Sequence, residues 1–113
     1  MDVELQGVGV EGEVLDPALL DRFAAARAES LAAFGPGHER SIQILEAIAN
    51  LRLEQGRPSE AQHAFEQVLA AIETGPLRGG AFHGLVLNNL GNLHMTREQY
   101  AEAEPYLVRA RAL

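Results

Sequence analysis

The chain has 113 residues, of which 47% are hydrophobic and 22% charged, a composition typical of one globular domain. Collagen-like, coiled-coil and wholly disordered chains are excluded by this balance, and the absence of cysteine excludes disulfides, thiol nucleophiles and cysteine-ligated metals. The net charge of −7 argues against a nucleic-acid surface, which needs a basic stripe to replace the counterions of phosphates.

Most of this negative charge lies at the start of the chain. Residues 1–21 contain six acidic side chains and no basic one, and glycines at positions 7, 9 and 12 disfavour a strand there. We therefore expect residues 1–15 to form a mobile acidic leader. The start lacks the basic and apolar regions of a signal peptide, and no apolar run approaches the roughly 18 residues of a membrane span. These features predict a cytoplasmic protein that does not bind membranes.

From Asp16 onward the apolar residues follow a helical period. Asp16 and Pro17 suit the cap and the first turn of a helix, and Gly35-Pro36-Gly37 ends that helix at Phe34. Glycine and proline divide the remainder into four further predicted helices, at about 38–55, 58–73, 80–96 and 100–113. No strand pattern interrupts them, so the sequence predicts an all-α fold of about five helices.

The two halves of this helical region resemble each other when one is shifted by 42 residues. The shift aligns several pairs of identical residues: Leu45 with Leu87, Asn50 with Asn92, Leu51 with Leu93, Glu60 with Glu102 and Ala61 with Ala103. Small residues recur where two antiparallel helices would approach closely. We therefore expect stacked helical hairpins over residues 16–113, made of a half repeat at 16–34 and full repeats at 37–73 and 79–113.

The segments LEAIANLRLEQGRPSEAQHAFEQVLAAIE and LNNLGNLHMTREQYAEAEPYLVRARAL resemble tetratricopeptide (TPR) repeats. The small residue that the family carries in its first helix corresponds to Ala49 and Gly91, and the alanine of its second helix to Ala61 and Ala103. The 42-residue spacing and the linker FGPGHER resemble the kinesin-light-chain variety. The resemblance implies a right-handed superhelix of antiparallel hairpins, a TPR-like α-solenoid. In one departure from the family, Glu98 replaces a turn glycine.

The residues that could carry chemistry form no recognised catalytic or metal motif. The four histidines show no i, i+4 pair beside a carboxylate, and no serine stands in a G-x-S-x-G turn. The glycine-rich segment 75–80 follows no predicted strand and lacks the G-K-[ST] of a phosphate loop. We therefore predict a chain without catalysis, metal or cofactor. An enzyme whose site these patterns do not reveal is the least favoured alternative.

Four asparagines stand inside predicted helices, although this residue is unfavourable there. The resemblance implies that the first helices of successive repeats line a concave groove in which amides at the places of Asn50 and Asn92 hold a peptide backbone. An amide donates and accepts hydrogen bonds, as a peptide bond does. The alternative is that these asparagines cap or bridge neighbouring helices. The predicted groove residues are Gln43, Glu46, Asn50, Glu54, Leu85, Asn88, Asn92 and Met95.

The last predicted helix reaches the final residue with no polar helix after it. A solenoid repeat buries its apolar face only against a neighbour, so Tyr106, Leu107 and Leu113 are candidates for self-association. The leading hypothesis is a non-catalytic module that binds a protein or peptide segment. The alternative is a structural module that forms a homo-oligomer or belongs to a longer regulatory scaffold.

Overall fold

The computed structural model describes residues 17–113, which contain five α-helices and no strand. The helices are α2 (Pro17–Phe34), α3 (Glu39–Glu54), α4 (Pro58–Glu73), α5 (Ala81–Thr96) and α6 (Tyr100–Ala112). The prediction of an all-α chain with about five helices is confirmed over this range, with helix ends that differ from the predicted ones by no more than one residue. The predicted leader and the predicted cap at Asp16 lie outside the described residues.

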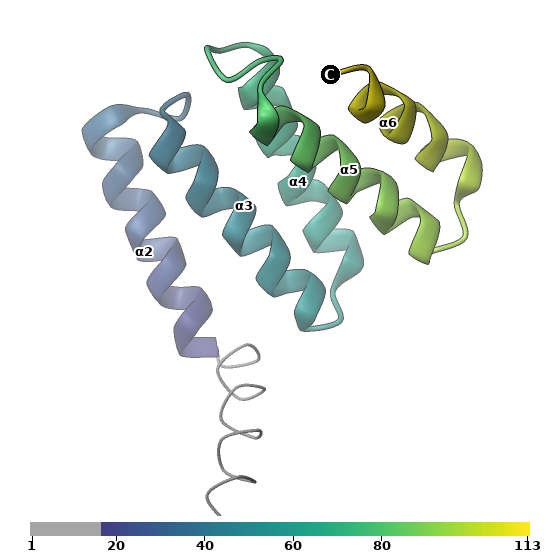
Figure 1. Ribbon diagram of the computed structural model, residues 1–113. Helices are drawn as coiled ribbons and strands as arrows, with labels where there is room; N and C mark the ends of the chain where they lie inside the picture. The colour runs from purple at the N-terminus through teal and green to yellow at the C-terminus, as the bar shows by residue number, and fades with distance from the viewer. Residues whose placement is uncertain (1–16) are drawn as a thin grey trace, which may run out of the picture.

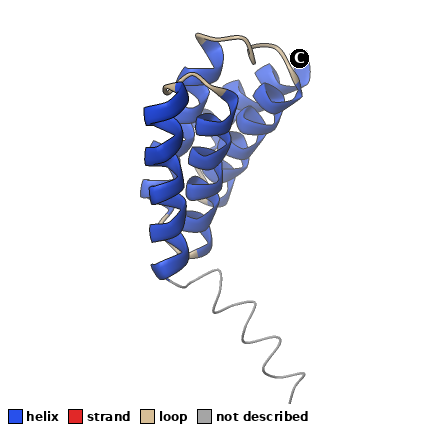
Figure 2. Cartoon of the chain, turned by 90° about the vertical axis from the view of Figure 1, so that its left-hand side faces the viewer, coloured by secondary structure: helices blue, strands red, loops and turns tan. Residues whose placement is uncertain are grey.

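Each helix packs against the next one along the chain. Contacts join α2 to α3, α3 to α4, α4 to α5 and α5 to α6. Short turns reverse the chain between neighbours, so successive helices run in opposite directions, and Figure 1 shows them following one another from α2 to α6. Figure 2 shows the same array from the side of α2. The helices at the two ends of the array, α2 and α6, each have one main neighbour within the part of the chain that the structure describes.

The turns after α3 and α5 share a left-handed residue. Gly56 follows α3 with φ of 77°, and the N–H of Arg57 donates to the carbonyl oxygen of Arg52 at 2.9 Å. After α5, Glu98 has φ of 59°, and the N–H of Gln99 donates to the carbonyl oxygen of His94 at 2.8 Å. A non-glycine residue is uncommon in this conformation. The hydrogen bonds that close the end of α5 therefore hold Glu98 in the geometry that glycine adopts more readily.

The hydrophobic core lies in the three central helices. Phe65, Val68 and Ile72 of α4, together with Val86 and Leu90 of α5, are fully enclosed. By contrast, Ala103 is the only buried residue of α6, and α2 contributes Ser30, whose hydroxyl lies 2.6 Å from that of Ser41 in α3. The stability of the described fold therefore rests mainly on α3, α4 and α5.

Small residues stand at enclosed positions of these helices, as the sequence predicted. Ala49, Ala61 and Ala103 are completely inaccessible to solvent. At Gly91 a Cβ atom would overlap the side chain of Leu107, so only glycine fits there without displacing that side chain. At Gly91 it is therefore the neighbouring helix α6 that excludes a larger side chain.

Replacing Ala61 by leucine should overpack the core, because Ala61 is fully enclosed in α4. We expect a loss of about 1–3 kcal/mol in the free energy of unfolding, measured by urea denaturation. The matched control is Ala70→Leu, which makes the same change at an exposed position of the same helix and should alter stability little. Equal effects of the two substitutions would show that Ala61 does not stand at a close contact.

Candidate functional site

The predicted groove residues form an exposed surface on two helices. Gln43, Asn50 and Glu54 of α3 are exposed and Glu46 is half-buried, whereas Leu85, Asn88, Asn92 and Met95 of α5 are all exposed. Their spacing of three or four residues places each set along one stripe of its helix. We call these eight residues the α3–α5 face. The helices that carry them are separated in sequence by α4, which packs against both.

The side-chain amides of this face make only local hydrogen bonds. The amide of Asn50 donates to the Glu46 carboxylate at 2.6 Å, four residues earlier on the same helix, and Gln43 donates to Glu39 at 3.0 Å. Within residues 17–113, the side chains of Asn88 and Asn92 make no hydrogen bond. None of these amides forms a hydrogen bond to another helix. No contact of theirs therefore supports the alternative that the asparagines bridge neighbouring helices. The two amides on α5 can both donate to and accept from a ligand.

Exposed apolar side chains flank these amides. Leu85 and Met95 are 48% and 43% exposed, and Leu53 on α3 is 40% exposed. Leu53 is absent from the predicted set, although it lies 42 residues before Met95 and the repeat shift could have identified it. Large exposed apolar groups beside polar ones are typical of surfaces that bind a partner.

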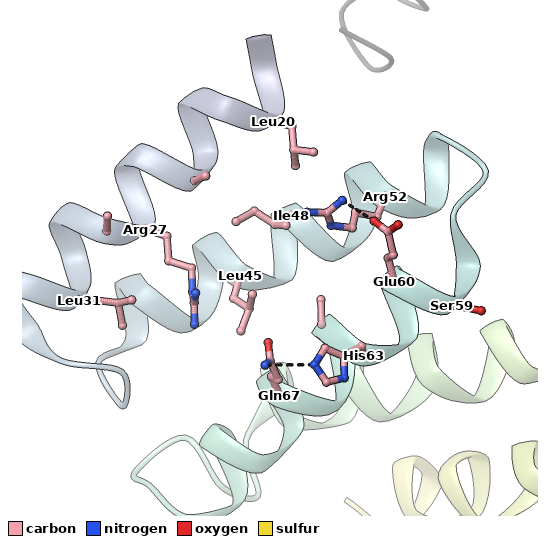
Figure 3. Close-up of a pocket in the computed structure, with 13 residues that line it drawn as sticks. Leu20, Arg27, Leu31, Leu45, Ile48, Arg52, Ser59, Glu60, His63 and Gln67 are labelled. Atoms are coloured by element: carbon pink, nitrogen blue, oxygen red, sulfur yellow. Dashed lines mark hydrogen bonds and ion pairs between the residues drawn. The ribbon is translucent and has the colours of Figure 1, made fainter. Parts of the chain in front are cut away.

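A second candidate site, not predicted from the sequence, is a hollow of about 590 Å³ between α2 and α4 (Figure 3). Its floor is α3, and we call it the α2–α4 hollow. Its apolar lining consists of Leu20, Ala24, Ala28 and Leu31 of α2, Leu45 and Ile48 of α3, and Ala64 of α4. Its polar lining consists of Arg27, Arg52, Ser59, Glu60, His63 and Gln67.

Charges at this hollow are only partly paired. The Arg52 guanidinium lies 2.5 Å from the Glu60 carboxylate, which Arg57 also approaches at 3.6 Å. Arg27 has no ion pair or hydrogen bond with any described residue, and its Nε atom is enclosed without a partner. Among the described residues, the hollow therefore combines an apolar lining with a positive charge at Arg27 that no acid compensates.

Each histidine makes a contact that orders a turn or a helix. His38 caps α3 by accepting from the N–H of Arg40 at 3.1 Å, and His63 lies 3.5 Å from the amide of Gln67. The ring of His94 stacks on Tyr106 with centroids 5.5 Å apart, and its Nδ1 atom lies 2.8 Å from Gln99. In residues 17–113 no three histidine, aspartate or glutamate side chains are grouped so that they could hold a metal ion.

His83 is buried at the start of α5 and fastens the turn before it. Its Nδ1 atom accepts from the N–H of Gly79 at 2.9 Å, and its Nε2 atom lies 3.3 Å from the Glu73 carboxylate. Burial, with a smaller contribution from Arg78, lowers the pKa of His83 below its ordinary value. The Nδ1 atom also cannot take up a proton without losing the bond from Gly79. The neutral ring is therefore the form that the fold stabilises.

The predicted self-association residues differ in their exposure. Tyr106 and Leu107 are half-buried against α5, whereas Leu113 is 52% exposed. The most exposed large apolar side chain of α6 is instead Tyr100, at 58%, followed on the same helix by Val108. The expectation that these side chains are exposed at the end of the array thus holds for Leu113 but only in part for Tyr106 and Leu107. Self-association through the three residues stays a prediction.

Comparisons with known proteins do not assign the chain to a family. No protein-family model matches it, and no curated protein matches its sequence. Among residues 17–113, no helix combines the length and apolar character that crossing a bilayer requires. The α3–α5 face and the α2–α4 hollow are therefore the features from which a function can be argued.

The lowered pKa of His83 predicts that stability falls in acid. As the pH drops below about 6.5, the unfolded chain takes up a proton on this histidine more readily than the folded chain does. The free energy of unfolding, measured by urea denaturation, should therefore decrease between about pH 7.5 and about pH 5.5. His83→Gln keeps a neutral acceptor and donor without a titrating ring, so its decrease should be smaller. Identical decreases for the two proteins would show that His83 titrates equally in the folded and unfolded states.

Proposed function

We propose that the chain is a non-catalytic protein-interaction module that binds an extended peptide segment on the α3–α5 face. The observation that carries the proposal is the pair of exposed asparagine amides, at Asn88 and Asn92, whose hydrogen-bonding groups no other described residue satisfies. An amide that both donates and accepts matches the N–H and C=O of a peptide backbone. The apolar side chains of Leu85 and Met95, next to these amides, offer contacts for the side chains of such a segment.

We further propose that the helices form a right-handed TPR-type superhelix of the kinesin-light-chain variety. This proposal is supported by similar environments at positions 42 residues apart. Ala61 and Ala103 are both fully enclosed, and Ala49 and Gly91 are both buried. Gly56 and Glu98 both adopt a left-handed conformation at the turn inside a hairpin. In such a superhelix the first helices of the two hairpins, α3 and α5, would face the same concave side.

The charges of the α3–α5 face favour a neutral or basic segment. Glu46 and Glu54 lie on α3, and the carboxylate of Glu46 is held beside Asn50. Basic side chains of the ligand would be attracted to these acids, whereas acidic ones would be repelled. Affinity for a basic peptide should therefore decrease as the salt concentration rises, since the pairs are exposed to solvent.

Removing the Asn92 amide should weaken peptide binding with little effect on stability. The test peptide is a neutral or basic twelve-residue sequence selected from a random library on the full chain. Asn92→Ala should raise its Kd about five- to 150-fold, because the backbone groups it held would be buried without partners, at a cost of about 1–3 kcal/mol. Fluorescence anisotropy measures the Kd, and thermal unfolding measures stability.

The matched control is Asn89→Ala, which removes the neighbouring amide on the same helix but outside the α3–α5 face. This variant should retain the affinity of the unaltered chain. A loss of stability with full affinity in Asn92→Ala would assign the asparagine a structural role. Equal weakening in both variants would instead contradict the placement of the peptide.

A further inference from the structure

The α2–α4 hollow has a counterpart 42 residues further along the chain. A second hollow, of about 400 Å³, lies between α4 and α6 over α5. Each of its seven lining residues stands 42 positions after a residue that lines the α2–α4 hollow. Two pairs of equivalent positions differ most in side-chain chemistry. Ala64 of the α2–α4 hollow corresponds to Tyr106 of the second hollow, and Arg52 corresponds to His94. The two hollows are therefore equivalent sites that carry different side chains.

The ring of Tyr106 lines the second hollow. The ring is half-buried and stacks on His94, with the two planes 4° from parallel. At the equivalent place in the α2–α4 hollow, alanine stands instead of tyrosine and the planar Arg52 guanidinium instead of the imidazole. The α2–α4 hollow therefore has no built-in ring at the place where Tyr106 lines the second hollow.

The side walls of the two hollows also differ in polarity. Gln62 and Glu66 line the second hollow, and their equivalents in the α2–α4 hollow are Leu20 and Ala24. The second hollow thus has a polar wall next to the ring of Tyr106, whereas the α2–α4 hollow has an apolar wall next to an open space. Apolar walls of this kind favour burial of an apolar side chain from outside.

We propose that the α2–α4 hollow binds an aromatic side chain from an acidic peptide segment of a partner protein. The ring would take the place that Tyr106 fills in the second hollow and stack on the guanidinium of Arg52, as arginine does on aromatic faces. Ala64 leaves the space for it, and Leu20 covers its edge. This site is distinct from the α3–α5 face and does not depend on the function proposed for that face.

The acidic character of the partner follows from Arg27. Glu60 already neutralises Arg52 at 2.5 Å, whereas Arg27 is unpaired among the described residues. Figure 3 shows the Arg27 side chain reaching from α2 toward α3 beside Leu45. A carboxylate next to the aromatic residue of the partner would compensate this charge and accept hydrogen bonds from the guanidinium.

The experiment selects random twelve-residue peptides on the full chain and sorts the binders by composition. We expect one class with an aromatic residue flanked by aspartate or glutamate. Replacing its aromatic residue by alanine should weaken binding at least about tenfold, since a ring buried in the hollow contributes more than about 1.4 kcal/mol. Arg27→Gln should weaken the acidic peptide about tenfold while leaving a version with glutamine in place of its acids unchanged. Absence of this class among the binders overturns the proposal.

Two variants test whether the peptide binds in the α2–α4 hollow. Ala24→Glu, at an exposed position, reproduces Glu66 of the second hollow and should abolish binding of the acidic aromatic class through charge repulsion. Arg52→His with Ala64→Tyr copies the stacked pair of the second hollow and should abolish the same binding by filling the space, provided that thermal unfolding shows the variant to be folded.

Asn92→Ala is the matched control and should leave this peptide class unaffected, whereas it weakens the neutral or basic class. If Ala24→Glu still binds the acidic aromatic peptides, or if Asn92→Ala no longer binds them, the assignment of these peptides to the hollow is overturned. A second copy of the chain as the occupant would also overturn it, and would appear in sedimentation as a concentration-dependent mass that Ala24→Glu abolishes.

Discussion

The close approach of neighbouring helices at small side chains is the constraint on which the other features of the structure depend. At Gly91 the space that a Cβ would need is taken by Leu107, and Ala61 and Ala103 are fully enclosed by the helices around them. These contacts fix how far apart successive helices lie. They therefore also influence which stripes of α3 and α5 remain exposed.

Local signals made the helices predictable with little error. Pro58 begins α4, Gly56 ends the turn before it, and the apolar period of α4 matches its buried residues. The residues of the α3–α5 face came from the resemblance to TPR repeats together with the 42-residue shift, which aligns Asn50 with Asn92, and all of them except the half-buried Glu46 are exposed. Leu53 was missed on that face, although the same shift places it at the position of Met95.

The α2–α4 hollow could not be derived from spacing within any one helix. It exists because three helices meet and because one of them carries alanine at position 64, so its volume depends on a distance between elements that are not consecutive. The exposure of α6 was misjudged for a related reason. Tyr106 and Leu107 belong to an apolar stripe that the sequence left without a neighbour, yet α5 covers them in part, and Tyr106 finds a stacking partner in His94.

Differences between equivalent positions are more informative about function here than the similarities. Residues that remain alike at the 42-residue spacing, such as Ala61 and Ala103, are buried and explain packing. Residues that change, such as Ala64 to Tyr106 and Ala24 to Glu66, lie around the hollows and alter what each hollow can accept. Packing requires one kind of side chain at each close contact, and it leaves the walls of a hollow free to vary. An array of this type can therefore present acids on the α3–α5 face and, at the α2–α4 hollow, an arginine that no residue within 17–113 pairs. The two surfaces would select segments of opposite charge, so a single partner that carries a basic stretch and an acidic aromatic stretch would be held at two points.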